Sequence, residues 1–449
     1  MHILFHIVQL PFPSCAEPHP KVREYYEDYS RLFQVFLKDY FIPEDALWEL
    51  PLWAAHLAGM VRKVGGTPVL DDLSGCPADL EVCVRELEDR TQRGDILLLS
   101  PLAQNYDLTL EISRRMMAGG RCTVIGGNMA PLVKSSDATV VHHGQATPES
   151  LRRALSGVAS EVENHMDRRD TAGWIPDYNL LREYDQKVPL LRLNASHGCL
   201  FRCEFCGDAW SRKLVLVEPS ALEAEVQQFE DYFPDTRLIY IGDKTFGQSP
   251  DAVELLLKVF ANRPQYRFIV QTHFLALKDD LIEQMRALGV VAVEIGFESA
   301  SAELLLQNRK VMKDVRELRD RLRRLNDCGI KVVLNVLNGL PQEDGEAHRK
   351  TLDFMHQSSA EVSLFNLYNF VPYPLTPLYP QLKSRIVDWN FRNWREDGLA
   401  VFELDKISRE ESFSFFLEKV DVAREIVRNH LALASSPAEN YEAVVAGGV

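Results

Sequence analysis

Short apolar segments alternate with amphipathic segments along most of this chain, and this alternation restricts the fold more than any other feature of the sequence. When a strand is followed by a helix and then by another strand, the helix carries the chain back across the sheet, so the two strands lie parallel. Parallel strands are buried on both faces, which is why such segments are apolar throughout. The sequence therefore predicts an α/β protein. A polar interruption divides the alternation into two series, and we expect two sheets.

The first series, residues 1–157, predicts a Rossmann-like domain with a parallel sheet. Glycines adjoin its strands at Gly65-Gly66, Gly126-Gly127 and Gly144, either because a ligand approaches the carboxyl edge of the sheet or because the turns are tight. Residues 158–188 are polar and are expected to form a linker. Strands are predicted at His2–Val8, Thr67–Leu70, Asp95–Leu99, Cys122–Ile125 and Ala138–Val141. Helices are predicted at Tyr25–Tyr40, Leu50–Lys63, Ala78–Arg90, Tyr106–Met117 and Thr147–Leu155.

The second series, residues 189–379, contains six strand candidates separated by helical segments. A C-terminal helical cap is expected over residues 380–449, with an amphipathic helix at Ser408–His430. The six strands are predicted at Leu190–Ala195, Leu238–Ile241, Arg267–Gln271, Val291–Ile295, Lys331–Leu337 and Ser363–Asn369. The intervening helices are predicted near residues 219–232, 250–262, 279–288, 311–328 and 343–357.

The composition excludes some classes of partner. The net charge of −15 at pH 7 argues against binding to nucleic acid, because phosphates require a basic surface. The same acidity suits a cationic small-molecule substrate. No apolar run has the length of a membrane span, and the start of the chain lacks the features of a secretory signal. We therefore predict a cytoplasmic protein without a membrane partner, in a compartment that keeps thiols reduced.

Three cysteines, Cys199, Cys203 and Cys206, have the spacing C-x3-C-x2-C within eight positions. Thiolates at such spacing can share one iron–sulfur cluster. With three ligands, a [4Fe-4S] cluster keeps one iron open to a cofactor or substrate. The alternatives are a zinc site that uses His197, although ligands so close in sequence would strain a tetrahedron, and inert buried thiols. The density of cysteines favours the cluster.

This spacing, with the aromatic residue Phe205 before the third cysteine, resembles the signature of the radical S-adenosylmethionine (SAM) superfamily. The resemblance implies that the open iron chelates the amino and carboxylate groups of SAM. An electron from the cluster then cleaves SAM to methionine and a 5′-deoxyadenosyl radical, which abstracts hydrogen from the substrate. It also implies a partial (β/α)6 barrel with the active groups at the carboxyl ends of its strands. A flavodoxin- or ferredoxin-type protein would donate the electron.

The segments that follow the barrel strands extend the resemblance and suggest SAM contacts. Gly242 and Asp243 stand where the family approaches the methionine amino group, although Asp243 could instead cap a turn. Glu298 and Ser299, in a Gly-Phe-Glu-Ser segment, would bind the ribose hydroxyls. Arg309 stands where a cation pairs with the SAM carboxylate, and its bidentate geometry suits that role.

Two further segments complete the predicted site. Asn338, Gly339 and Leu340 resemble the segment that packs on the adenine. Gln271 and His273 follow the third strand and are expected to point polar groups toward the same end of the barrel. His273 is a candidate for substrate contact or proton transfer because histidine titrates near neutral pH, and a hydrogen-bonded structural histidine is the alternative.

The N-terminal series is similar to the cobalamin-binding domain that precedes many radical SAM barrels. The matching pieces are Val124–Gly127, the strand near Asp137–Val141 and His143-Gly144-Gln145. The D-x-H-x-x-G loop, whose histidine would ligate cobalt, is absent from this region. Cobalamin is therefore a candidate cofactor to which no residue is assigned.

The resemblance leaves two net reactions open. The first is radical dehydration or deoxygenation of an aminosugar or aminoglycoside, a lyase reaction of antibiotic biosynthesis, which the acidic chain and the missing cobalt ligand favour. The alternative is C-methylation through methylcobalamin. A hypothesis of another class is a non-catalytic iron–sulfur or zinc-binding regulatory protein.

Overall fold

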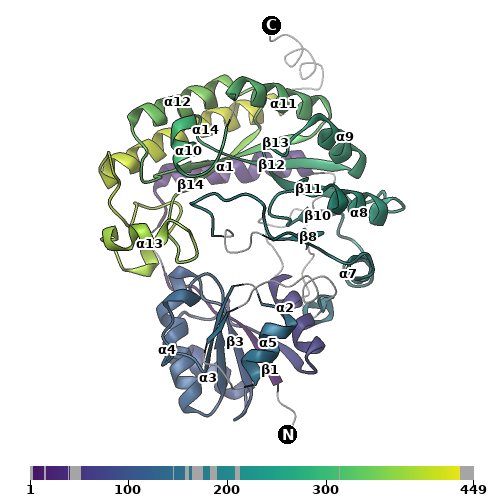
Figure 1. The fold of residues 1–449 in the computed structure, drawn as a ribbon, viewed down its shortest axis with the longest axis vertical. Coiled ribbons are helices and arrows are strands. Elements are labelled where there is room, and N and C mark those ends of the chain that lie inside the picture. The colour runs from purple at the N-terminus through teal and green to yellow at the C-terminus, as the bar shows by residue number, and fades with distance from the viewer. Residues whose placement is uncertain are drawn as a thin grey trace.

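The computed structural model describes residues 4–14, 17–38, 40, 52–144, 146–156, 161–163, 175–182, 190–207, 213–312 and 314–434. These residues form two parallel six-stranded sheets, one in each half of the molecule, with helices packed against them (Figure 1). The predicted α/β class is confirmed. Within the described residues, no helix has the length and apolar content that crossing a bilayer requires.

The first sheet has the strand order β2-β1-β3-β4-β5-β6. The chain moves outward from β1 to β2 and then returns to the other side of β1, so the direction of winding reverses between β1 and β3. Ligands of open parallel sheets bind outside the carboxyl ends of the strands at such a reversal. The strands are β1 (Leu4–Gln9), β2 (Thr67–Asp72), β3 (Ile96–Leu99), β4 (Cys122–Ile125), β5 (Val140–His143) and β6 (Glu161–Glu163). Strand β6 falls in the segment predicted as a linker.

Helices cover both faces of this sheet because its central strand is apolar on both sides. Leu97 and Leu99 of β3 pack with α3 (Leu80–Arg90) and α4 (Tyr106–Ala118), whereas Ile96 and Leu98 pack with α2 (Leu52–Lys63). Helix α5 (Pro148–Leu155) lies on the same face as α2 (Figure 1). Successive residues of a strand point to opposite faces, so one run of four apolar residues serves two cores.

The second sheet has the order β14-β13-β12-β11-β10-β7, in which each strand lies beside its predecessor in the series. This is the progression of the predicted partial barrel. The strands are β7 (Leu191–Leu193), β10 (Leu238–Ile241), β11 (Arg267–His273), β12 (Val290–Glu298), β13 (Lys331–Asn338) and β14 (Leu364–Asn369). The helices between them are α7 (Pro219–Tyr232), α8 (Pro250–Phe260), α9 (Asp279–Leu288), α10 (Ala302–Gln307), α11 (Val315–Asp327) and α12 (Gly345–Gln357).

Helix α1 (Pro20–Leu37) belongs to the barrel, although it follows the first strand of the other sheet. It lies beside β14 and the C-terminal helix α14 (Arg409–Ala434) (Figure 1). The Tyr25 hydroxyl donates to the Phe365 carbonyl, and the Tyr26 hydroxyl donates to the Leu367 carbonyl at 3.0 Å. Strand β14 is an edge of the sheet, so these hydroxyls occupy carbonyls that a further strand would otherwise pair.

The segment before α14 joins the two halves. The predicted C-terminal cap has single helical turns between residues 379 and 393 and a long helix only from Arg409, and residues 435–449 lie outside the described part. Trp394 is fully buried, and the Phe391 ring meets the Tyr106 ring of α4 at 4.9 Å. A single apolar core runs from the α3 and α4 face of the first sheet to this segment.

Candidate functional site

The three cysteines lie on a loop, residues 194–207, that leaves β7 at the carboxyl edge of the barrel sheet. We call it the cluster loop. Its short strand β8 (Ser196–His197) pairs with β9 (Val215–Leu216), and residues 208–212 are outside the described part. Cys199, Cys203 and Cys206 form no disulfide; Cys203 is buried and the other two are half-buried. Burial raises the pKa of the Cys203 thiol, and the Lys310 ammonium opposes that shift.

Asp243 ties the start of the cluster loop to the barrel. One carboxylate oxygen accepts from the Ala195 and Ser196 amides at 2.7 and 3.0 Å, and the other accepts from the Ser196 hydroxyl at 2.5 Å. Burial raises the pKa of Asp243 to about 6. Both oxygens therefore serve the loop. The predicted contact with the SAM amino group would have to come from the backbone here, and the structure favours the alternative in which Asp243 caps backbone amides.

Contacts on both sides hold the rest of the loop. Gln248 accepts from the Leu200 amide and donates to the Gly198 carbonyl, both at 3.0 Å. Farther along, the Glu204 amide donates to the Asn308 carbonyl at 3.0 Å, and the Glu204 carbonyl accepts from Leu378 at 3.2 Å. The loop is thus fixed before and after its buried cysteine.

This arrangement fits a cluster. Among the described residues, no three Cys, His, Asp or Glu side chains meet at one point as the ligands of a single metal ion would. A cubane does not require this, because each thiolate binds its own iron. Three thiols that form no disulfide, on a loop held at both ends, supply the soft donors that iron–sulfur clusters use.

His273, at the end of β11, lies against the cluster loop. Its ring stacks on Phe201 with 3.9 Å between centroids and an angle of 3°. The Leu275 amide donates to Nδ1 at 3.1 Å, so Nε2 carries the proton of the neutral ring, and Nε2 has no partner among the described residues. Burial lowers the pKa of His273 to about 2, and Lys310 adds to that effect. The expected titration near neutral pH is therefore wrong for this geometry.

Glu298 and Lys310 form a buried pair beside the cluster loop. The Lys310 ammonium donates to Glu298 Oε1 at 3.1 Å and lies 5.9 Å from the centre of the Phe205 ring. Arg309, the cation chosen from the sequence, is 62% exposed and pairs with Glu204 at 2.6 Å. The cation inside the site is therefore Lys310. Arg309 has φ of 53°, a left-handed conformation that residues other than glycine rarely adopt.

The Ser299 side chain is buried and forms its hydrogen bonds within the protein core. Its hydroxyl lies 3.0 Å from the Thr351 hydroxyl and accepts from the Ser301 amide at 3.1 Å, and the side chain is fully buried. Of the two predicted ribose ligands, Glu298 alone retains an oxygen, Oε2, for which the described residues provide no hydrogen-bond donor.

The loop after β13 is held by its own Glu343 and by residues of β14 and α14. Gly339 has φ of 75°, and its amide donates to Glu343 Oε2 at 2.6 Å. Asn338 donates to Asn369 Oδ1 at 2.6 Å and accepts from Lys419 at 2.5 Å. Leu340 is fully buried in the core that the two halves share.

The remaining predicted residues lie at the ends of β10 and β11. A side chain at Gly242 would come within 2.8 Å of the Arg192 guanidinium, so glycine keeps the backbone close to β7. The Gln271 amide donates to the Asp243 carbonyl at 3.1 Å and its oxygen accepts from Tyr240 at 3.3 Å. The structure thus brings these residues to the same edge as the cluster loop.

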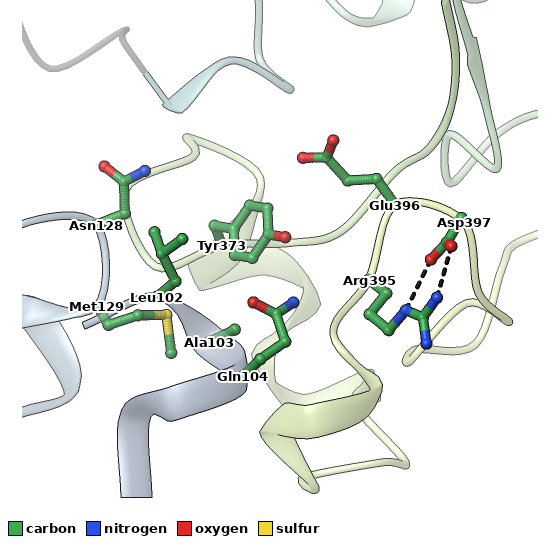
Figure 2. A pocket seen from close by; sticks show the side chains of 9 residues that line it. All are labelled: Leu102, Ala103, Gln104, Asn128, Met129, Tyr373, Arg395, Glu396 and Asp397. Atoms are coloured by element: carbon green, nitrogen blue, oxygen red, sulfur yellow. Dashed lines mark hydrogen bonds and ion pairs between the residues drawn. The ribbon is translucent and has the colours of Figure 1, made fainter. Parts of the chain in front are cut away.

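A cavity of about 380 Å³ lies between the carboxyl edge of the first sheet and the barrel. Tyr373 and the pair formed by Arg395 and Asp397, at 2.6 Å, line its barrel side, and Glu396 points away from that pair (Figure 2). Burial raises the pKa of Glu396, and Asp397 raises it further. The cavity is lined by Leu102, Ala103, Gln104, Asn128, Met129, Tyr373, Arg395, Glu396 and Asp397.

Residues 193–355, which carry the cluster loop and the barrel, match the family model described as the radical SAM superfamily. This part of the chain is a radical SAM domain. The match covers about a third of the chain.

Two curated relatives are similar in sequence. The chain is 25% identical over 331 residues to an uncharacterized methyltransferase of Synechocystis sp., covering 69% of this chain and 60% of that protein. It is 24% identical over 216 residues to the hopanoid C-2 methylase of Rhodopseudomonas palustris, covering 46% and 40%. The chain thus matches about half the length of these relatives.

Solved structures share the fold over more of the chain. The radical SAM methyltransferase TsrM from Kitasatospora setae, with cobalamin and a [4Fe-4S] cluster bound, has a TM-score of 0.61 at 14% identity over 86% of this chain and 75% of its own. The cobalamin-dependent radical SAM enzyme OxsB has a TM-score of 0.58 at 14% identity over 96% and 56%. The radical SAM domain is thus preceded in the chain by a domain with a cobalamin-binding type of fold, as the sequence predicts. Aminosugar dehydration finds no support in these likenesses.

Proposed function

We propose that this protein is a cobalamin-dependent radical SAM methyltransferase that acts on a small molecule. The observation that carries the proposal is the cavity at the carboxyl edge of the first sheet, which opens between that sheet and the barrel. The strand order agrees with it in part, because the winding reverses between β1 and β3 and the cavity is lined from the segments after β3 and the next strand, β4. The names of both curated relatives, a methyltransferase and a methylase, favour methyl transfer over dehydration.

The barrel residues divide the work of holding SAM. Cys199, Cys203 and Cys206 would bind the cluster, which when present supplies the electron that cleaves SAM to a 5′-deoxyadenosyl radical. Glu298 would accept from a ribose hydroxyl through Oε2, while Lys310 holds Oε1 and so fixes the carboxylate.

The cavity fits part of a corrinoid. Pockets of roughly 300–1,000 Å³ hold drug-sized ligands, so cobalamin would fill a cavity of about 380 Å³ and extend beyond it. The nine described residues of its wall include no histidine, in keeping with the missing D-x-H-x-x-G loop. Asn128 would donate hydrogen bonds to its amide groups, whereas the Tyr373 hydroxyl and one Gln104 amide hydrogen already go to the Trp394 carbonyl at 3.2 and 2.7 Å. When bound, cobalamin would supply the methyl group.

The test is anaerobic reconstitution with iron, sulfide and hydroxocobalamin. We expect about one cobalt per chain and, with SAM and a reductant, methylation of the bound cobalamin together with 5′-deoxyadenosine. Production of 5′-deoxyadenosine by protein that binds no cobalt would refute the methyltransferase and return the dehydratase to consideration. The flavodoxin- or ferredoxin-type donor and the cytoplasmic location remain predictions.

A further inference from the structure

We infer that Lys419, on the C-terminal helix α14, positions the loop after β13, so that SAM affinity depends on a helix outside the segment that matches the radical SAM family model. The family model ends at residue 355, whereas α14 spans Arg409–Ala434. The inference rests on the proposed radical SAM function and on the adenine contact that the family resemblance implies for Asn338, Gly339 and Leu340.

Lys419 is buried and begins a chain of hydrogen bonds that leads to the loop after β13. Its ammonium donates to Glu343 Oε1 at 2.8 Å and to Asn338 Oδ1 at 2.5 Å. The side chains of Lys419 and Glu343 are each 1% exposed. Lysine is almost never buried to this extent unless a partner holds its charge, so both groups depend on each other.

The connection continues from Glu343 to the backbone that would face adenine. The second carboxylate oxygen, Oε2, accepts from the Gly339 amide at 2.6 Å. Gly339 is in the left-handed region, where the backbone conformation is set by what its amide and neighbours contact. Lys419 therefore holds one oxygen of the Glu343 carboxylate, and the other oxygen of that carboxylate holds the Gly339 amide.

A second residue of α14 holds the same loop. The Asn338 side chain donates to the Ser412 carbonyl at 3.0 Å. Ser412 and Lys419 are seven residues apart, which places them two turns apart on one face of the helix. That face thus contacts the first and last residues of the loop, Asn338 and Glu343, through directional bonds.

Stability alone does not account for this pair. A buried ion pair typically contributes little more to stability than apolar residues of the same volume, because both charges lose their hydration. Both oxygens of the Glu343 carboxylate accept hydrogen bonds, however, and these bonds define one orientation of the loop. This is the property that a ligand-binding loop requires.

The experiment compares Lys419→Met with Lys406→Met. Lys406 also pairs with a carboxylate of this segment, Asp344, at 2.7 Å, but both side chains are partly exposed. We would measure iron content, thermal stability, the Kd of SAM from its effect on the EPR spectrum of the reduced cluster, and 5′-deoxyadenosine formation at saturating SAM.

We expect Lys419→Met to raise the Kd of SAM at least about tenfold, as for a lost hydrogen bond to a charged group, with iron content retained. Lys406→Met should change it by less than about twofold. Adding Glu343→Gln to Lys419→Met removes the unpaired charge and should restore part of the affinity. A Kd within twofold of wild type in Lys419→Met would overturn the inference.

If Lys419→Met cannot be isolated folded, the double variant decides the matter, because it leaves no buried charge. We then expect its SAM Kd to exceed the wild-type value about threefold or more, since Asn338 loses its donor. A wild-type Kd would refute positioning by Lys419. Wild-type protein that forms no 5′-deoxyadenosine would instead refute the proposed function.

Discussion

The carboxyl edges of the two sheets are built differently. The barrel edge is dense with charged side chains in fixed pairs, including Lys310 with Glu298 and Lys419 with Glu343. The edge of the first sheet is a hollow, lined on that side by Leu102, Ala103 and Met129 and two amide side chains. The barrel edge suits a zwitterionic cofactor that needs opposite charges at fixed positions. The edge of the first sheet suits a large cofactor held by shape and by amide hydrogen bonds.

This difference predicts at which edge a single side-chain substitution should have a large effect. At the barrel edge, removing one charge leaves its partner buried and unpaired, so single substitutions have large consequences. At the hollow edge, truncating one contact changes little, and only filling the space should interfere. The predictions below test that contrast.

Cys203→Ser should abolish the cluster and all 5′-deoxyadenosine formation, because serine does not replace the buried thiolate as a soft ligand. Cobalt binding at the other edge should persist. Iron analysis and chromatography of the reaction products measure both. Cys328→Ser, at a half-buried cysteine outside the site, is the control and should retain its iron. Loss of cobalt binding in Cys203→Ser would show that the edges are not independent.

Asn128→Trp should weaken cobalamin binding by about tenfold or more, because an indole would occupy space that the ligand needs. Asn128 is exposed at the cavity wall, so the fold should tolerate the change. Gln92→Trp adds the same group to an exposed position before β3, at the opposite edge of that sheet. Absorbance titration with hydroxocobalamin compares the two. Equal affinities in both variants would contradict a corrinoid in this cavity.

The contact of α7 with the helical turn Tyr178–Leu181, which also touches α2 of the first half, should make stability depend on pH. Burial raises the pKa of Glu225, which accepts from the Tyr178 hydroxyl at 2.8 Å, to about 8. A carboxyl with a raised pKa in the folded state stabilises below its unfolded pKa, near 4.5, and loses that contribution as pH rises through about 8. The free energy of unfolding should therefore fall by a few kcal/mol over this window, and Glu225→Gln should flatten the fall. Identical pH profiles of thermal denaturation for both proteins would rule this out.

Glu298→Ala should weaken SAM binding by about 1–3 kcal/mol, the range for a lost hydrogen bond to a charged group. Ser299→Ala should leave SAM affinity within about twofold, because that hydroxyl already serves Thr351 and Ser301. The same EPR titration measures both. The opposite ranking would restore Ser299 as the ribose ligand.

The sequence predicts the six barrel strands well because each is a short apolar run ending near a glycine or a polar residue. It also predicts Cys199, Cys203 and Cys206 as a group, because their spacing needs no tertiary information. What a side chain does at the end of a strand depends on backbone that is remote in sequence. Asp243, for example, binds amides 47 and 48 residues away.

Other differences have equally specific causes. The choice between Arg309 and Lys310 depends on one left-handed backbone conformation, which composition does not reveal. Helical periodicity predicts α1 but does not say which sheet it covers. Lys419 does leave a signal, since it interrupts the apolar stripe of α14 that contains Phe416, Val420 and Ala423.

The position of α1 has a consequence for synthesis of the chain. Asp28 on this helix pairs with Arg424 and Arg428, about 400 residues later. A ribosome therefore releases α1 long before α14, so the face of α1 that meets α14 lacks that neighbour until translation is almost complete. An expression fragment that stops at the barrel would leave that face uncovered, so attempts to produce either half alone should begin by deciding where α1 is to go.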